Sequence, residues 1–508
     1  MLTRRVLVAA RIRPLDRPEN VLDWMLCEGG AVVSGGRGPA PDAALEGSDL
    51  LELEGCTVIP ALHDAHVHLL GTGQAGLDLD LGGARCFDEV LELVAGAARR
   101  AEGPILRAHS FDPDLMPDGR YPTAADLDGV SAALPIHVKR RDGHSSSANT
   151  AALALLGVLP GRPGVETDAT GRPTGILRGK AHSDVAAAAS DLLSREERAS
   201  CYRRAAAAAA SRGIGCVHAL VGRDDPANED VEILLEVQPE LPIDVVVFAQ
   251  TTDVDRVVAL GLPRIGGCLL LDGSFGSRTA ALTVPYEDGG GTGTLYFSDD
   301  ELTGFLRKAQ SRGLQVAVHA IGDRAVGQAV ACYSAAFGGD ARGARHRIEH
   351  CELSTPGNVA TMSRLGIASC VQPAFELFWG GAGRMYEQRL GTARAARTNP
   401  FRTMLGSGVR LAGGSDSSVT PMDSILGVHA AVNRANRDES LTAFDALSLF
   451  TSGAAWLSFD EHRRGTLTPG KEASFTVLGA DPLDADPASL KDVPVVGLYV
   501  RGARVFGA

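Results

Sequence analysis

The sequence has little of what identifies membrane, zinc-ribbon or nucleic-acid-binding proteins. No stretch approaches the roughly 20 apolar residues that a membrane-spanning helix requires, so we expect no membrane partner. The nine cysteines are an odd number, are widely scattered and form no C-x-x-C pair. This pattern disfavours a structural zinc ribbon and favours free thiols in a reducing cytoplasm.

Basic residues are fewer than acidic residues in this chain. The 49 Lys and Arg residues face 62 Asp and Glu residues, which gives a formal net charge of −13. Because binding to nucleic-acid phosphates needs a basic surface, this composition argues against a nucleic-acid partner. Hydrophobic residues (44%) and charged residues (22%) are in the balance typical of a globular protein. At 508 residues the chain is longer than a single hydrophobic core usually serves, so we expect one large domain with a smaller domain or insertions.

The two ends of the chain differ in pattern from its middle. Residues 1–60 and 461–508 contain short apolar β segments divided by Gly and Pro, which predict one small β domain built from both termini. Residues 61–460 alternate strand-like runs with helical stretches, the pattern of βα units and a parallel sheet. Residues 110–185 are rich in Pro, Gly and Asp and interrupt this rhythm, so we expect an inserted subdomain there. Residues 1–14 lack the apolar length of a signal peptide, and we expect a first strand.

The segment VIPALHDAHVHL, residues 58–69, carries the strongest sign of chemistry. It is an apolar strand pattern that ends in His66 and His68. Residues two apart in an extended chain project to the same side, so both imidazoles can bind one cation while Val67 faces away. Imidazole nitrogens suit Zn²⁺ and other borderline divalent metals. An isolated H-x-H pair is weak evidence in a chain with 13 histidines, so support must come from elsewhere.

Three later residues provide that support, because each lies where an apolar strand gives way to a polar loop: His319 in VAVHAIGD, His350 in HRIEHCEL and Asp416 in VRLAGGSDSS. Ahead of His319, the capping box of Ser298 and Glu301 predicts a helix that leads into the strand. Barrel enzymes assemble their sites at the carboxyl ends of such strands. A lone histidine is as often a hydrogen-bonded core residue, but four histidines and an aspartate in this arrangement argue against coincidence.

Nine blocks of the sequence resemble the amidohydrolase superfamily, and within it the amidohydrolase-3 branch of YtcJ-like proteins, which includes N-substituted formamide deformylases. The blocks extend over essentially the whole chain. They are PALHDAHVHL (60–69), RRDGHSSSANTAAL (140–153), RPTGILR (172–178), LDGSFGSRTAAL (271–282), VAVHAIGD (316–323), HRIEHCEL (346–353), VQPAFELFW (371–379), GGSDS (413–417) and GTLTPGKEASFTVL (465–478).

The resemblance implies an α/β fold, a distorted (β/α)₈ barrel at 61–460 with a β-sandwich formed by the two termini. It also implies a divalent metal, zinc before others, as one or two ions. His66 and His68 would hold the more buried ion. His319 and His350 would hold a second or adjacent one, and Asp416 would be the general base.

Cys268 departs from the pattern of many relatives. They carry a carboxylated lysine that bridges two metals four residues before the motif that here begins at Asp272. A cysteine cannot form a carbamate. It is either a thiolate ligand, as in the related D-aminoacylases, or a small buried core residue. The metal count is therefore open, with a single ion favoured.

Other residues near these blocks have two interpretations each. His144, in the DGH block of the resemblance, either contacts the substrate or orders its loop. Trp379 either lines the pocket or packs. We expect structural roles for His63 and His218, and we expect Asp64 to tether the turn before the H-x-H pair.

The expected reaction is hydrolysis of a non-peptide C–N bond, in an amide, N-formyl or N-acyl compound, by a metal-activated hydroxide. Asp416 would move the proton from water to the leaving nitrogen. One alternative is deamination of a heterocycle, which the run AIGD after His319 disfavours because it lacks the glutamate of such deaminases. Another is a barrel without catalysis that serves as a binding module. A small-molecule amide is the expected partner, and a homodimer is plausible by base rate.

Overall fold

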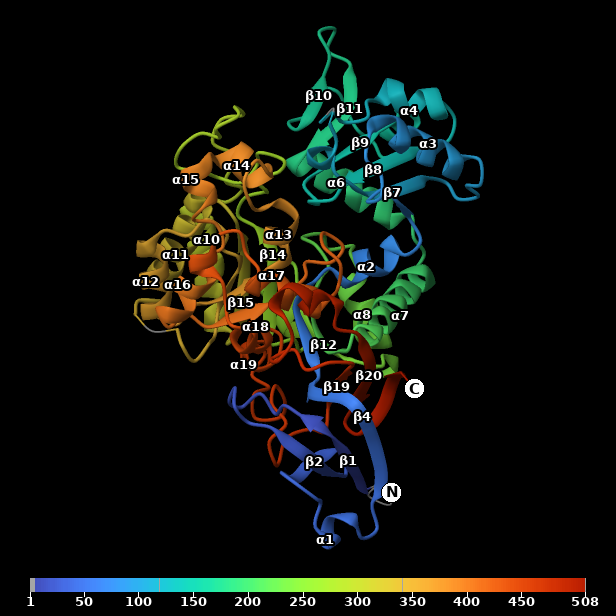
Figure 1. The fold of residues 1–508 in the computed structure, drawn as a ribbon. Coiled ribbons are helices and arrows are strands. Elements are labelled where there is room, and N and C mark those ends of the chain that lie inside the picture. Colours follow the sequence, from blue (N-terminus) through green and yellow to red (C-terminus); the bar gives the residue numbers. More distant parts are fainter. Residues whose placement is uncertain (1–4, 118, 340, 508) are drawn as a thin grey trace.

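The structure, a computed structural model, describes residues 5–117, 119–339 and 341–507 (Figure 1). Its centre is a sheet of eight parallel strands in the order β18-β17-β16-β15-β14-β13-β12-β5. A parallel bridge between Val67 of β5 and Ser417, in the segment that follows β18, nearly closes the barrel. The strands are β5 (Leu62–Val67), β12 (Ile214–Val221), β13 (Asp244–Ala249), β14 (Arg264–Leu270), β15 (Gln315–Ala320), β16 (Arg347–His350), β17 (Ala368–Val371) and β18 (Leu411–Gly413). The predicted α/β barrel is confirmed.

Helices surround this barrel, and both faces of its strands are buried, as in parallel sheets generally. The predicted capping box of Ser298 and Glu301 starts α10, which leads into β15. No helix in the described ranges is long and apolar enough to cross a membrane. The main helices outside the strands are α7 (Arg195–Ser211), α8 (Asp230–Val237), α9 (Val254–Ala259), α10 (Asp299–Ser311), α11 (Asp323–Phe337), α12 (Pro356–Leu365), α16 (Phe401–Gly406), α17 (Ser424–Val432), α18 (Ala443–Leu449) and α19 (Ser452–Leu457).

Both ends of the chain contribute to one seven-stranded sheet, in the order β21-β20-β19-β4-β1-β2-β3. Side chains such as Val8, Met25 and Phe475 form its buried cluster. β4 continues into β5 with one residue between them, so this sheet is coupled directly to the barrel. The predicted first strand is β1, and residues 1–4 lie outside the described part. The strands are β1 (Arg5–Ile12), β2 (Leu22–Glu28), β3 (Ala31–Gly36), β4 (Asp49–Pro60), β19 (Phe475–Leu478), β20 (Val495–Val500) and β21 (Ala503–Gly507).

A six-stranded sheet, in the order β10-β11-β9-β8-β7-β6, forms a separate layer on the far side of the barrel from the terminal sheet (Figure 1). It begins at Leu79, earlier than the start near residue 110 that composition indicated. The reason is that β6, β7 and β8 run parallel with helices between them, the same local pattern as the barrel units. Its elements are β6 (Leu79–Asp80), α3 (Phe87–Ala98), β7 (Leu106–Phe111), α4 (Ala124–Val130), β8 (Ile136–Arg140), β9 (Ser145–Ala148), α5 (Thr150–Leu155), β10 (Val165–Thr167) and β11 (Pro173–Arg178); α6 (Gly179–Asp191) follows.

Helix α2 (Leu69–Ala75) starts directly after the H-x-H pair and fixes its position. It packs against α7 so closely that a Cβ on Gly73 would overlap the carbonyl oxygen of Cys201. A backbone oxygen cannot rotate away as a side chain can. Only glycine therefore permits this approach of the two helices.

We expect the Gly73→Ala substitution to destabilise the fold by about 1–3 kcal/mol, because the two helices must separate to admit the methyl group. Gly71→Ala is the matched control in the same helix, since its Cβ would meet only the Cβ of His68, at 3.8 Å. Thermal unfolding should show a lower midpoint for the first variant and no loss for the second. Equal midpoints would contradict the packing described.

Candidate active site

The structure brings the predicted ligands together at the carboxyl ends of the barrel strands. His66 lies in β5, His319 in β15 and His350 at the end of β16, while His68 and Asp416 follow β5 and β18. The Nε2 atoms of His66 and His68 each lie 3.2 Å from Oδ1 of Asp416. The ring centroids of His66 and His350 are 4.9 Å apart, and those of His350 and His319 are 4.4 Å apart.

Cys268, in β14, faces this cluster. Its Sγ lies 3.4 Å from Nδ1 of His319. Ligand atoms of His66, Cys268 and His350 lie within 4.8 Å of one another, as do those of His66, His68 and Asp416. Burial alone would raise the pKa of the Cys268 thiol, but the imidazoles of His319, His350 and His66 hold it well below its usual value. The side chain is therefore suited to be a thiolate.

Several polar atoms of the cluster are buried and make no hydrogen bond of acceptable geometry, in spite of the 3.2 Å contact between His66 and Asp416. They include both ring nitrogens of His350, Nε2 of His66 and Oδ1 of Asp416. An unsatisfied buried polar group is costly, so native structures rarely keep one without a reason. One or two divalent cations would satisfy these atoms, and a set of imidazole, thiolate and carboxylate donors suits zinc. The residues therefore fit a metal site.

Backbone conformation adapts two of these residues to the site. His350 and Asp416 have φ of 68° and 56°, in the left-handed region that non-glycine residues enter at a cost of about 1–3 kcal/mol. Such strain is concentrated at functional sites. Gly414, two residues before Asp416, allows close contact, since a Cβ there would lie 2.5 Å from the Cβ of His66.

Glu349 was missed by the sequence interpretation, and it orients His66. Its Oε2 lies 2.7 Å from Nδ1 of His66, and its Oε1 lies 2.5 Å from Nε of Arg347. This contact leaves Nε2 of His66 directed at Asp416. Adjacent residues in a regular strand alternate sides, which would direct Glu349 away from a site that contains His350; the positive φ of His350 breaks the alternation. The available signal was an acid inside an otherwise buried strand pattern, which requires a partner.

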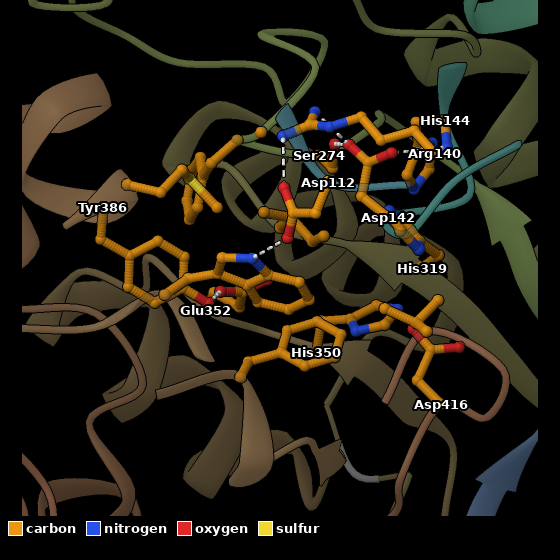
Figure 2. Close-up of a pocket in the computed structure, with 17 residues that line it drawn as sticks. Asp112, Arg140, Asp142, His144, Ser274, His319, His350, Glu352, Tyr386 and Asp416 are labelled. Atoms are coloured by element: carbon orange, nitrogen blue, oxygen red, sulfur yellow. Dashed lines mark hydrogen bonds and ion pairs between the residues drawn. The ribbon is translucent and has the colours of Figure 1, made fainter. Parts of the chain in front are cut away.

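A pocket lies above the cluster, and three of the candidate ligands, His319, His350 and Asp416, line it. Figure 2 shows Arg140, Asp142 and His144 at the top of the view, with His350 and Asp416 at the bottom. The lining side chains are Asp112, Arg140, Asp142, His144, Ser274, Phe275, His319, Ile321, His350, Glu352, Phe375, Trp379, Met385, Tyr386, Asp416 and Val419, with Gly276. The inserted layer supplies Asp112 and Arg140, and the turn after Arg140 supplies Asp142 and His144. Strands, loops and short helices of the barrel domain supply the other lining residues.

His144 and Trp379 both line this pocket. The ring centroid of His144 lies 5.5 Å from that of His319, and burial together with His319 lowers the pKa of His144 to about 4. Nε1 of Trp379 donates to Oδ2 of Asp112 at 3.2 Å. Both residues are therefore placed to contact a substrate.

The remaining polar residues beside the cluster organise the chain around it. Oδ1 of Asp64 accepts from the backbone amides of His66 and Ser415, the tether that the sequence suggested. Asp272 accepts from three backbone amides of the loops that follow β14 and β15. His218 accepts at Nδ1 from Arg347 at 3.1 Å, below the site.

We expect Glu349→Gln to weaken metal binding by about 10–100-fold, because the carboxylate that orients His66 is lost. Zinc affinity can be measured by competition with a chelator, with circular dichroism to verify folding. Glu352→Gln is the control: this nearby carboxyl bonds the Tyr386 hydroxyl instead of an imidazole, so its loss should leave zinc affinity unchanged. Identical affinities in the two variants would refute the orienting role.

Comparison with known proteins places this geometry in a family. The profile described as "Amidohydrolase family" matches residues 49–506. The YtcJ protein of Bacillus subtilis (strain 168) is 28% identical over 493 residues, which cover 90% of each chain. An N-substituted formamide deformylase from Arthrobacter pascens is 25% identical over 534 residues, covering 98% of this chain and 97% of the relative.

A solved structure shares the complete architecture. It is an uncharacterized metal-dependent hydrolase from Pyrococcus horikoshii OT3, with a TM-score of 0.77 and 27% identity, covering 95% of this chain and 99% of that one. The match therefore includes the terminal sheet and the inserted layer as well as the barrel. The chain belongs to the amidohydrolase family, and its predicted place in the YtcJ-like branch is confirmed.

Proposed function

We propose that this hydrolase cleaves a non-peptide C–N bond of a small molecule, in an N-formyl or N-acyl amine. The observation that carries the proposal is the convergence of four imidazoles, a thiol and a carboxylate, of which His319, His350 and Asp416 line one pocket. The bond class is supported by the similarity to a protein named N-substituted formamide deformylase.

Two groups that share His66 would hold the metal. His66, His68 and Asp416 form the first, and His66, Cys268 and His350 form the second. His319 lies beside the second group, with its Nδ1 3.4 Å from Sγ of Cys268. We assign Cys268 as a thiolate ligand rather than a core residue, because its Sγ is directed at the imidazoles. Zinc is the proposed ion. Its chemistry at such a site is polarisation of a carbonyl and activation of water at neutral pH.

Asp416 is the proposed proton carrier. Burial would raise the pKa of its carboxyl, but the adjacent His66 and His68 hold it well below its usual value, so the group is ionised at neutral pH. In hydrolysis the water oxygen bonds to the carbonyl carbon and the C–N bond breaks. Asp416 would take a proton from the water and deliver it to the nitrogen, because an amine leaves poorly until it is protonated. His144, beside His319, would orient the carbonyl group.

We expect Asp416→Asn to lower kcat by about 10²–10⁴-fold, since the amide side chain cannot accept the proton. The zinc-loaded protein would be assayed for amine release from a panel of N-formyl and N-acetyl amines. Ser274→Ala, a change in the same pocket away from the ligands, is the comparison. Full activity of the Asp416→Asn variant would refute the assignment, and ammonia release from heterocycles without activity on amides would favour deamination.

A further inference from the structure

We infer that the amine part of the substrate is apolar and carries no carboxylate. The inference rests on the proposed amide hydrolysis and narrows its substrate class. It follows from two features of the pocket, a wall of aromatic side chains and an arginine, Arg140, whose charge is offset by aspartates of the protein.

The aromatic wall begins at the ligand cluster. The ring of Phe375 stacks on that of His350 with centroids 5.9 Å apart, and Trp379 meets Phe375 edge-on at 4.9 Å. Phe275 and Tyr386 form a second edge-on pair at 5.7 Å. All four rings are buried, and all line the pocket. An apolar ring bound against this wall would gain burial and favourable edge or face contacts.

Arg140 is the one arginine or lysine among the described residues that line the pocket. Its NH1 atom donates to Oδ2 of Asp142 at 2.8 Å and to Oγ of Ser277 at 3.1 Å. Its NH2 atom donates to Asp114 and lies 3.9 Å from Asp112. The remaining donor, Nε, is buried and has no surface open to the pocket. The charge of Arg140 is therefore offset by three aspartates, and its paired donors are not free for a substrate carboxylate.

Two further arginines near the pocket, Arg389 and Arg141, also face aspartates. Arg389 bonds Asp114 at 2.6 Å and Asp288 at 2.5 Å. Arg141 lies 3.8 Å from Asp112, with its guanidinium over the ring of Phe378. A carboxylate beside the scissile bond would thus lose its water and meet aromatic rings and aspartates. Burying a charge without a partner is strongly unfavourable, so the pocket rejects N-acyl amino acids and accepts N-acyl amines.

The test compares two substrates that differ only by that carboxylate, N-formyl-2-phenylethylamine and N-formylphenylalanine, the latter as both enantiomers. With the zinc-loaded protein we expect kcat/KM to be about 100-fold higher for the uncharged amide. A ratio below tenfold, or a preference for the amino acid, would overturn the inference while leaving amide hydrolysis intact.

If neither compound is hydrolysed, the proposed function fails for formamides, and calorimetric binding of the same pair then decides the inference. Binding of the uncharged compound at least tenfold more tightly supports it. Equal affinity, or no binding of either compound, overturns it.

A variant with one charged partner removed tests the role of Arg140. Asp114→Asn removes a charged partner from Arg140, so the kcat/KM of N-formylphenylalanine relative to its uncharged partner should rise about tenfold. Asp288→Asn is the matched control, because it removes a partner of Arg389 and leaves Arg140 paired. Retained turnover of the uncharged amide verifies folding. An unchanged ratio in the Asp114→Asn protein would contradict the explanation.

Discussion

Closure of the barrel between its first and last strands is the constraint on which the site depends. The amide of His68 donates to the carbonyl of Ser417 at 2.9 Å, and the amide of Asp416 donates to the carbonyl of His66 at 2.8 Å. These two bonds join segments that lie about 350 residues apart in sequence. They hold the H-x-H pair against the carboxylate, and the strands between them bring the other ligands to the same rim. The relative positions of the candidate ligands therefore depend on how the parallel sheet closes.

Closure of the barrel buries polar atoms whose hydrogen-bonding capacity is not satisfied by other groups of the protein. Both nitrogens of His350 are in this state, while His66 is fixed from behind by Glu349 and Arg347. Folding to this arrangement is costly, and an ion that satisfies the atoms stabilises the folded chain by mass action. The barrel strands provide these ligands, and the inserted layer with the barrel loops provides the pocket. The candidate ligands and much of the pocket wall therefore come from different parts of the chain.

The sequence predicts what depends on local pattern and misses what depends on tertiary geometry. The strand ends at His319 and His350 follow from apolar runs that meet polar loops. Glu349 could not be placed because only the positive φ of its neighbour turns both side chains inward. Composition places the start of the inserted layer later than the structure does, because the first parallel strands of this layer have the same sequence pattern as barrel strands. The partners of Arg140 are aspartates from its own layer and a serine of a barrel loop, which only folding brings together.

X-ray absorption at the zinc edge of the purified, zinc-loaded protein tests the central claim most directly. The account predicts a bound ion with several nitrogen neighbours from imidazole and one sulfur neighbour at about 2.3 Å, and loss of the sulfur contribution in a Cys268→Ser variant. A protein that retains no zinc, or an ion surrounded by oxygen and nitrogen alone, would contradict it.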